Sequence, residues 1–450
     1  MNNSTCLVLK FGGTSVKDAE TINKVLNIVS IDNTKKVIIV SAHAGVTNLL
    51  VEICNSKKDT ISSLLSQLYK IHSGIAKDLN ILDSTKEFIM NELSEIDVIT
   101  NYLPLSPQLK DVVMSKGEVL SSMLIYTYFK EQGKSIAFVD SREVMKTNSQ
   151  FTNAELDFDL SCKNIEEQFL NYFDEYDLII MGGFIASDED GRPTTLGRGG
   201  SDYTAAVVSS ALNATELQIW TDVNGILTSD PRFIEGVKKV RKLSYSEASE
   251  LSFFGAKVLH PSTIHPAVKK GIPVRVKNTF NPNDDGTLVL SEKSNIEMIK
   301  AIAFRKDVIT ITLRSNRMLG AYGFMSKVFQ SFEKLKIPVD IVTTSEVSIS
   351  VTVNKNEYNP NIEKELSVLG EVTISEGNAI ISAIGEGIKE TAGIANRLFG
   401  ALKGINISMV SVGASEVNLS IVVSEEDLQR AVTLLHNEFF NDSLNPVFFE

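Results

Sequence analysis

Short apolar runs alternate with amphipathic stretches over the first two thirds of the chain. In the segment 16–29 the apolar residues recur with a helical period of about 3.6 residues, with Ser15 and Asp18 as the expected capping pair. Strands that alternate with helices predict an α/β fold with a largely parallel sheet. The runs with the length of a buried strand are 7–11, 37–42, 136–140, 177–185, 217–223 and 272–276.

The remaining third contains an internal repeat. Residues 323–353 align with residues 393–423 without a gap, at a constant offset of 70. Each copy reads as a glycine, one helix, a strand, a turn and an alternating strand, so the repeat predicts two similar α+β units. The polar turn cluster 281–287 precedes this region. We therefore expect a first region of residues 1–295 and a second of residues 296–450.

Composition limits the possible partners of the chain. Its 450 residues are too many for one ordinary domain, and 43% are apolar, which is enough for a large core. A formal net charge of −12 argues against extended binding to nucleic acid or anionic membranes, which needs basic patches. Three cysteines without a CxxC spacing indicate a reducing compartment. With no signal-peptide pattern and no apolar run long enough to span a bilayer, we expect a cytoplasmic protein.

A candidate phosphate-binding loop follows the first apolar run. Lys10, Gly12 and Gly13 stand between that strand and a helix, where glycines allow a bound group to approach the backbone closely. The free N–H groups of a helix N-terminus favour an anion, and Lys10 can reach the same anion. Neither a Walker A loop nor GxGxxG is complete, because Tyr128 and Asp202 stand where each motif needs glycine. The pattern predicts phosphate binding outside these two classes.

A second glycine-rich segment, residues 195–204, also leads into a helix. Arg198 carries the planar guanidinium fork that suits a carboxylate. Gly199 and Gly200 again allow close backbone approach. Asp202 either caps this helix or orients nearby lysines, and the sequence leaves both interpretations open.

Six motifs follow one another along the chain: KFGGTSV, SAHAGVTNLL, SKGEVLSS, TTLGRGGSDYTA, IWTDVNGILTSDPR and FGAKVLHP. Together they resemble aspartate kinases of the amino-acid kinase family, and the resemblance covers essentially the whole chain. It implies a largely parallel sheet sandwiched by helices, followed by two ferredoxin-like ACT domains. We expect these domains at about 310–380 and 381–450, with one possible arrangement being an insertion of one into the other. Because the chain ends after the repeat, it resembles the monofunctional, lysine-sensitive type.

The resemblance implies transfer of the γ-phosphoryl group of ATP to the β-carboxylate of L-aspartate. The product, 4-phospho-L-aspartate, begins the synthesis of lysine, threonine and methionine. A carboxylate with an ordinary pKa of about 3.9 is already ionised, so no general base is needed. Positioning and electrostatic stabilisation then carry the reaction, with Mg²⁺ held mainly by the phosphates and not by a metal site of the protein. Two alternatives stay open: another amino-acid kinase, acting on acetylglutamate or glutamate, and an inactive amino-acid sensor.

The resemblance also implies roles for single residues. Lys10, Lys257 and the amides of Gly12 and Gly13 stabilise the transferring group, and Asp202 organises the lysines. Arg198 binds the α-carboxylate of the substrate, and Glu118 binds its ammonium group. The other expected substrate contacts are Thr47, Gly199, Gly200 and Ser201. The nucleotide is lined by Lys10, Phe11, Gly12, Gly13, Thr221, Asp222, Leu227, Asp230, Arg232, Lys257 and Val258.

Two positions depart from the family pattern. Leu227 stands where a tyrosine is usual, so an aromatic contact near the nucleotide is lost. His43 stands where a small residue is common, and we interpret it as a tolerated substitution and not as a catalytic group.

For the repeat region, the resemblance implies feedback inhibition by L-lysine. Asp340 and Glu346 supply negative charge for its ε-ammonium group, whereas Ala321 replaces a common serine and leaves the effector itself open. ACT domains commonly pair between subunits, so a homodimer or tetramer is implied. Three of the expected effector residues, Met318, Phe324 and Val339, could instead belong to the core of the ACT domain. The full expected set is Met318, Ala321, Phe324, Met325, Val339, Asp340, Thr344, Ser345 and Glu346.

Overall fold

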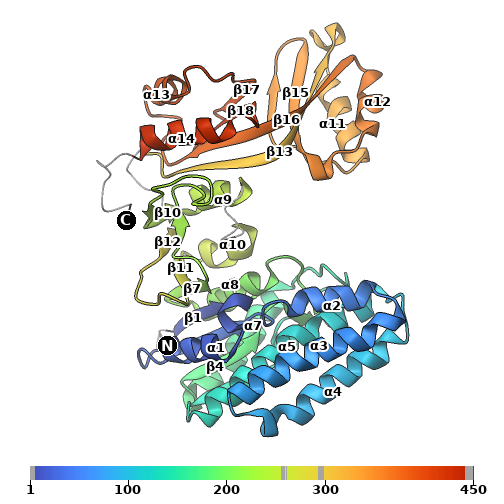
Figure 1. Cartoon of the computed structure of the whole chain (residues 1–450), viewed down its shortest axis with the longest axis vertical. Coiled ribbons are helices and arrows are strands. Elements are labelled where there is room, and N and C mark those ends of the chain that lie inside the picture. The colour runs from blue at the N-terminus through green and yellow to red at the C-terminus, as the bar shows by residue number, and fades with distance from the viewer. Residues whose placement is uncertain (1–5, 255–258, 260, 292–297, 441–448, 450) are drawn as a thin grey trace. The chain divides into compact units, whose positions relative to one another are not determined.

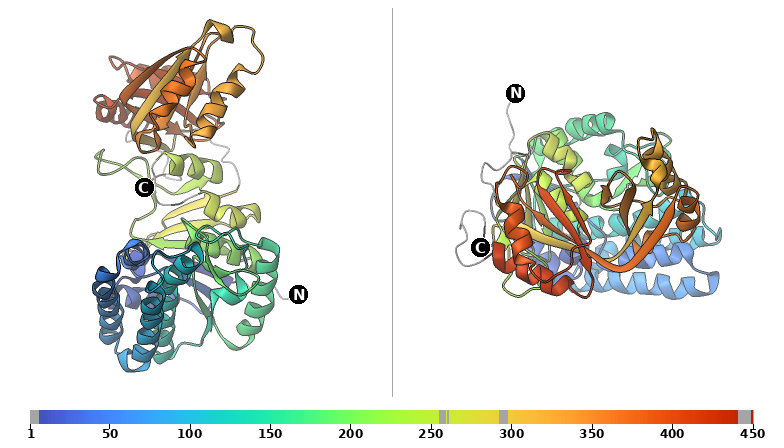
Figure 2. Two further views of the ribbon diagram at one scale, coloured as in Figure 1. Left: turned by 90° about the vertical axis from the view of Figure 1, so that its right-hand side faces the viewer. Right: turned by 90° about the horizontal axis from the view of Figure 1, so that it is seen from above.

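The computed structural model describes residues 6–254, 259, 261–291, 298–440 and 449. The chain divides into two compact units, which Figures 1 and 2 show from three directions. The first comprises Met1–Ile226 and Val258–Ser291, and the second Leu227–Lys257 and Glu292–Glu450. The segment 227–257, which the sequence prediction includes in the first region, belongs to the second unit.

The first unit is built on a largely parallel sheet, as predicted. Its strands run in the order β12-β11-β7-β1-β2-β4-β3, and only β11 and β12 pair antiparallel among these neighbours. The central position of β1 places the end of that strand, with Lys10, in the middle of the sheet. The strands are β1 (Cys6–Phe11), β2 (Lys35–Val40), β3 (Ile136–Val139), β4 (Leu178–Gly182), β7 (Glu216–Thr221), β11 (Val274–Asn278) and β12 (Thr287–Leu290).

Helices cover the sheet. On one face, Leu9 and Phe11 of β1 join a core formed with the helices α1 to α5. Because strand residues alternate between faces, Lys10 points to the other side, where α8 packs on β1. The helices are α1 (Ala19–Val29), α2 (Val46–Asn55), α3 (Lys58–Asp78), α4 (Leu82–Thr100), α5 (Pro107–Glu131), α6 (Ser141–Val144), α7 (Phe158–Glu175), α8 (Gly200–Leu212) and α10 (Pro261–Lys269).

Two predicted local features differ in detail. Helix α1 begins at Ala19, where Asp18 forms a capping box with Thr21, so the expected pairing of Ser15 with Asp18 is wrong. A separate 3₁₀ turn, η1 (Gly13–Val16), precedes this helix. The run 177–185 divides into β4 and β5 (Ile185–Ser187), which pairs with β6 (Pro193–Thr195).

The second unit carries one antiparallel sheet shared by both copies of the repeat. Its order is β14-β15-β13-β16-β18-β17, with the long strands β13 and β16 paired at the centre. Residues 301–305 of β13 pair with 380–384 of β16, which in turn pair with β18, so the start of β13 completes the second copy's side of the sheet. These strands are β13 (Ala301–Arg314), β14 (Val342–Thr344), β15 (Ser348–Asn354), β16 (Glu371–Ile384), β17 (Met409–Val412) and β18 (Asn418–Ser424).

Each copy contributes a helix whose N-cap residue is a glycine. Gly323 and Gly393 adopt φ angles of 75° and 81°, a left-handed conformation that glycine tolerates best. The helices of this unit are α9 (Tyr245–Phe253), α11 (Phe324–Lys334), α12 (Asn361–Ser367), α13 (Ile394–Ala401) and α14 (Leu428–Phe439). Three short strands lie between residues 226 and 244: β8 (Ile226–Leu227), β9 (Lys239–Val240) and β10 (Lys242–Ser244).

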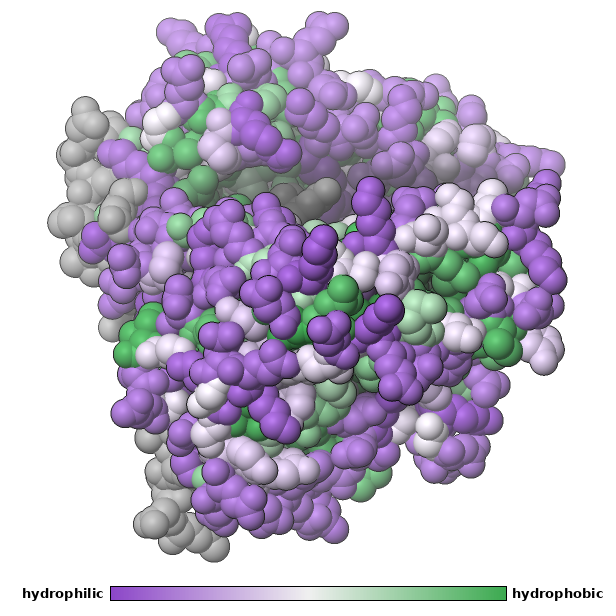
Figure 3. All heavy atoms as spheres, turned by 60° about the horizontal axis from the view of Figure 1, so that its bottom comes forward, coloured by the Kyte–Doolittle hydropathy of each residue, from purple (hydrophilic) through white to green (hydrophobic). Residues whose placement is uncertain are grey.

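The face drawn in Figure 3 is mostly hydrophilic, with scattered apolar side chains. No helix within the described part of the chain is both long enough and apolar enough to cross a membrane.

Candidate active site

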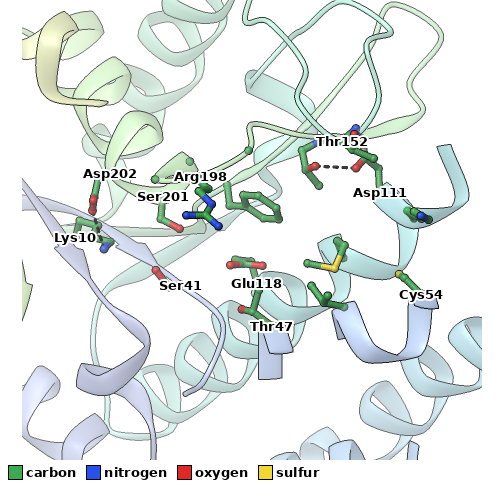
Figure 4. Close-up of a pocket in the computed structure, with 18 of the residues that line it drawn as sticks. Lys10, Ser41, Thr47, Cys54, Asp111, Glu118, Thr152, Arg198, Ser201 and Asp202 are labelled. Atoms are coloured by element: carbon green, nitrogen blue, oxygen red, sulfur yellow. Dashed lines mark hydrogen bonds and ion pairs between the residues drawn. The ribbon is translucent and has the colours of Figure 1, made fainter. Parts of the chain in front are cut away.

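A cavity of about 730 Å³ opens in the first unit beyond the ends of β1 and β2 (Figure 4). It brings together segments that lie far apart in the sequence: the end of β1, the loop after β2, helix α5 and the start of α8. The predicted catalytic and substrate residues that line it are Lys10, Thr47, Glu118, Arg198, Gly199, Gly200, Ser201 and Asp202.

An ion pair joins two of these segments. Lys10 Nζ lies 2.7 Å from Asp202 Oδ1, and the two side chains are only 12% and 17% exposed. Asp202 lies in the first turn of α8, whereas the N-cap of that helix is Gly199, with no side-chain capping bond. The interpretation of Asp202 as a helix cap is therefore wrong, and its carboxylate fixes the ammonium group of Lys10 instead.

The glycines of the first loop allow close packing. A Cβ atom on Gly13 would lie 2.8 Å from the carbonyl oxygen of Ala42, so only glycine fits there without a shift. The amide of Gly12 donates a 3.1 Å hydrogen bond to the carbonyl of Trp220. In this conformation the Gly12 amide is thus engaged with the protein, contrary to its expected role at a phosphate.

The glycines of the second loop serve a similar purpose. Gly199 has a φ angle of 73°, and a Cβ atom on Gly200 would lie 2.8 Å from the ring of Phe184. The loop can therefore turn sharply into α8 and present Arg198 and Ser201 to the cavity, as Figure 4 shows.

Glu118 is the buried acid of the site. It is 5% exposed on α5, and its Oε1 accepts a 3.1 Å hydrogen bond from the amide of Ala42. Burial raises the pKa of Glu118 to about 8, although the Ala42 hydrogen bond and the charge of Lys10 act in the opposite direction. Such a carboxyl group gains most from a cationic partner that enters the cavity.

Asp111 is a cavity residue that the predicted site does not include. Its Oδ2 accepts from the amides of Thr152 (2.8 Å) and Thr195 (3.1 Å), and its Oδ1 accepts from the Thr195 hydroxyl (2.7 Å). Burial still raises the pKa of Asp111. Asp111 precedes Glu118 by two helical turns, so both carboxylates lie on one face of α5. Through Thr195, Asp111 also binds β6, the strand that leads to Arg198. The available signal was this spacing of seven residues between two carboxylates.

The predicted nucleotide residues are more dispersed. Phe11 is fully buried and its ring stacks on that of Trp220, so its side chain belongs to the core and cannot line a ligand. In the first unit, Thr221 donates a hydrogen bond to its neighbour Asp222, and neither residue lines the cavity.

The remaining nucleotide residues lie on other segments. In the second unit, Leu227 lies in β8, and Asp230 forms a 2.7 Å ion pair with Arg232. The predicted residues Lys257 and Val258 lie outside the described residues.

The predicted effector residues fall into two groups. Phe324, with Met318, Met325 and Val339, packs into the core of the first repeat copy, as the alternative interpretation holds. Asp340 lies 2.7 Å from Arg305 through its Oδ1, and burial raises its pKa although Arg305 opposes the shift. The more exposed residues of this set are Ala321, Thr344, Ser345 and Glu346.

Comparison with known proteins agrees with this geometry. Residues 5–278 match the profile of the amino acid kinase family, and residues 311–362 and 381–439 match that of an ACT domain. Lysine-sensitive aspartokinase 3 of Escherichia coli is 38% identical over 97% of this chain and 100% of its own length. Aspartokinase 3, chloroplastic, of Arabidopsis thaliana is 35% identical, with 97% of this chain and 82% of that protein covered.

Solved structures give the same result. The crystal structure of E. coli aspartokinase III in complex with aspartate and ADP matches with a TM-score of 0.84 and 37% identity, over 97% of this chain and 100% of that chain. Aspartate kinase from Clostridium acetobutylicum matches with a TM-score of 0.85 and 30% identity, over 96% and 100%. The chain belongs to the amino acid kinase family and, within it, to the aspartokinases that carry ACT domains.

Proposed function

We propose that this chain transfers the γ-phosphoryl group of ATP to the β-carboxylate of L-aspartate. The observation that carries the proposal is the arrangement of charge in the cavity, whose lining includes the cations Lys10, Lys110 and Arg198 and the acids Asp111, Glu118 and Asp202. Of these, Lys10, Arg198 and the buried acid Glu118 are proposed to meet the substrates. Aspartate carries two carboxylates and one ammonium group, which is the complementary pattern. The aspartate and ADP bound in the similar E. coli structure support this choice of substrates.

In the proposed reaction Lys10 reduces the repulsion between two anions. The acceptor carboxylate is ionised at neutral pH and needs no base, so the main barrier is its approach to the polyanionic phosphates. Asp202 holds the ammonium group of Lys10 in place, which keeps the positive charge oriented before the substrates arrive. Lys257 is proposed to act beside it.

The nucleotide is proposed to enter as its magnesium complex. Within the described residues, no group of three or more His, Cys, Asp or Glu side chains could hold a metal ion. We propose that Mg²⁺ arrives with the nucleotide as part of the substrate, held mainly by phosphate oxygens. Thr221, Asp222, Leu227, Asp230 and Arg232 are proposed to contact the nucleotide.

Regulation and assembly extend the proposal. We propose that L-lysine inhibits the enzyme by binding near Asp340 and Glu346, since the E. coli relative is lysine-sensitive and a similar structure contains lysine and aspartate. We further propose a cytoplasmic homodimer or tetramer that associates through the ACT domains.

The direct test is to trap the acyl phosphate with hydroxylamine. The purified chain, given ATP and Mg²⁺, should form aspartyl hydroxamate with aspartate, and much less product with glutamate or N-acetylglutamate. Loss of activity on adding millimolar lysine would support the regulatory part. Preferential phosphorylation of glutamate or N-acetylglutamate would instead place the chain with other amino-acid kinases, and no turnover with any acceptor would favour an amino-acid sensor.

A further inference from the structure

His43 lies in the loop that follows β2 and reaches the loop that follows β1. We call residues 12–16 the phosphate loop and residues 41–47 the acceptor loop. The His43 side chain, 1% exposed, reaches out of the acceptor loop, and its Nδ1 atom lies 2.5 Å from the carbonyl oxygen of Val16. Val16 is fully buried and ends the 3₁₀ turn η1, where carbonyl groups lack partners within the turn. His43 therefore satisfies a buried acceptor at the end of the phosphate loop.

The two loops also touch at a second point. Gly13 of the phosphate loop lies so close to Ala42 that a Cβ atom on it would stand 2.8 Å from the Ala42 carbonyl oxygen. The amide of Ala42 in turn donates to Glu118, the buried acid of the cavity. A close backbone contact at one end and the His43 hydrogen bond at the other thus hold the loops in one relative position.

A second buried histidine lies beside the first, and both rings are held neutral mainly by their burial. The rings of His43 and His72, on α3, lie 5.4 Å apart between centroids, and His72 Nδ1 lies 2.7 Å from the carbonyl of Leu68. Burial lowers the pKa of His43 to about 3, with a further contribution from His72, and lowers that of His72 to about 4. Both rings are neutral near pH 7, so each has one N–H group, and the nearby carbonyl assigns it to Nδ1.

The Nδ1 atom is the part of the His43 ring that makes a polar contact with the described residues. Both Nε2 atoms are buried and have no hydrogen-bond partner within the part of the chain that the structure describes. His43 is also absent from the side chains that line the cavity. Its contribution is the Nδ1–H group that points to Val16.

We propose that His43 is a positioning residue that ties the acceptor loop to the phosphate loop and so fixes the acceptor carboxylate against the phosphates. The assignment rests on the proposed function. It also replaces our interpretation of His43 as a merely tolerated substitution, because a small residue at this position could not reach the Val16 carbonyl.

The test compares variants that keep or remove a donor at the Nδ1 position. The amide of His43→Asn can occupy the place of Nδ1, whereas His43→Leu fills space without a donor and His43→Gln places its amide near the position of Nε2. We expect His43→Leu and His43→Gln to lower kcat about tenfold, the size of one net hydrogen bond. The KM values for aspartate and ATP should change by less than about threefold, because each loop still binds its own substrate. His43→Asn should keep kcat within about threefold of the wild type.

The matched control is His72→Leu, which removes the neighbouring ring but leaves the contact with Val16. It should lower the melting temperature while leaving kcat near the wild-type value, with all rates measured well below the lowest Tm. Equal loss of kcat in His43→Asn and His43→Gln would overturn the proposal, as would full kcat in His43→Leu. If His43→Leu does not fold, the comparison of Asn with Gln decides alone.

Failure of the proposed function would give a different result. In that case the wild-type chain would form no aspartyl hydroxamate and would phosphorylate another acceptor, if any. The same kcat comparison with that acceptor would still test the tether. If no acceptor is phosphorylated, the test is how much bound MgADP strengthens aspartate binding in each variant. A smaller gain in His43→Leu than in His43→Asn would support the tether. An equal gain in both variants would overturn it.

Discussion

Two cation–carboxylate pairs in this chain have the same separation but different surroundings. Lys10 and Asp202 lie 2.7 Å apart beside the cavity of the first unit, and Arg305 and Asp340 lie 2.7 Å apart in the second unit. Beside the first pair, Arg198 adds a further cation to a cavity open to ligands. In the second, the Oδ2 atom of Asp340 is buried without a hydrogen-bond partner among the described residues.

This comparison shows that the length of an ion pair does not determine which ligand the surrounding site favours. Lys10 and Arg198 present two cationic groups to the same cavity, which favours an anion such as a phosphate or carboxylate there. The unpaired oxygen of Asp340 instead favours a cation such as an ammonium group. The following changes test the contrast, from the largest expected effect to the smallest.

Removing the cation of the first pair should have the largest effect. We expect Lys10→Met to lower kcat by at least about 100-fold, because the charge facing the transferring phosphoryl group is lost. The effect is measured with saturating ATP and aspartate. Lys10→Arg is the control that keeps the charge and should retain more activity, and an unchanged kcat in Lys10→Met would contradict the account.

Arg198 should affect substrate binding more than turnover. Arg198→Gln is expected to raise the KM for aspartate roughly 10- to 100-fold, since a charged hydrogen bond to the α-carboxylate is lost. Arg198→Lys should recover part of this loss, because it keeps the charge but not the fork. The initial rate as a function of aspartate concentration measures the effect. An increase confined to the KM for ATP would assign Arg198 to the nucleotide instead.

The raised pKa of Glu118, about 8, should make aspartate binding pH-dependent. Glu118 must lose its proton before it can pair with the ammonium group, so binding strengthens as pH rises. The apparent KM for aspartate should fall by up to about tenfold per pH unit below about pH 8 and level off above it. Glu118→Gln should raise this KM and remove its dependence on Glu118 ionisation. A wild-type KM that is flat over this range would contradict the prediction.

The smallest effect on basal activity is expected at the second pair. Position 340 corresponds to Val410 in the second repeat copy, so Asp340→Val makes the two copies alike there. We expect nearly unchanged kcat without lysine, but at least about tenfold more lysine for half-inhibition, because the acceptor of its ammonium group is gone. Val410→Thr is the control in the other copy and should leave inhibition unchanged. Equal lysine sensitivity in Asp340→Val and the wild type would exclude Asp340 as an effector ligand.

Much of the fold follows from local patterns in the sequence. The buried strands of a parallel sheet are continuous apolar runs, which is why the segments that became β1, β2 and β3 are readable directly. The constant offset of the repeat likewise anticipates paired α+β units, and β15 and β18 begin 70 residues apart, at Ser348 and Asn418.

The candidate site was less fully predictable, because its details depend on tertiary contacts. The motif around Gly12 suggests a free amide, but the adjacent strand β7 supplies a carbonyl acceptor for it. Phe11 adjoins the glycines, yet strand alternation turns its ring into the core. Asp111 and His43 act through partners distant in sequence, Thr195 and Val16, which no local pattern identifies.

The central claim is that the two ion pairs serve separate ligands of opposite charge. Calorimetric titration of the full chain with MgADP and, separately, with L-lysine tests it directly. We predict that Lys10→Met weakens MgADP binding and leaves lysine binding intact, and that Asp340→Asn does the reverse. Loss of both ligands in either variant, or of neither in both, would contradict the account.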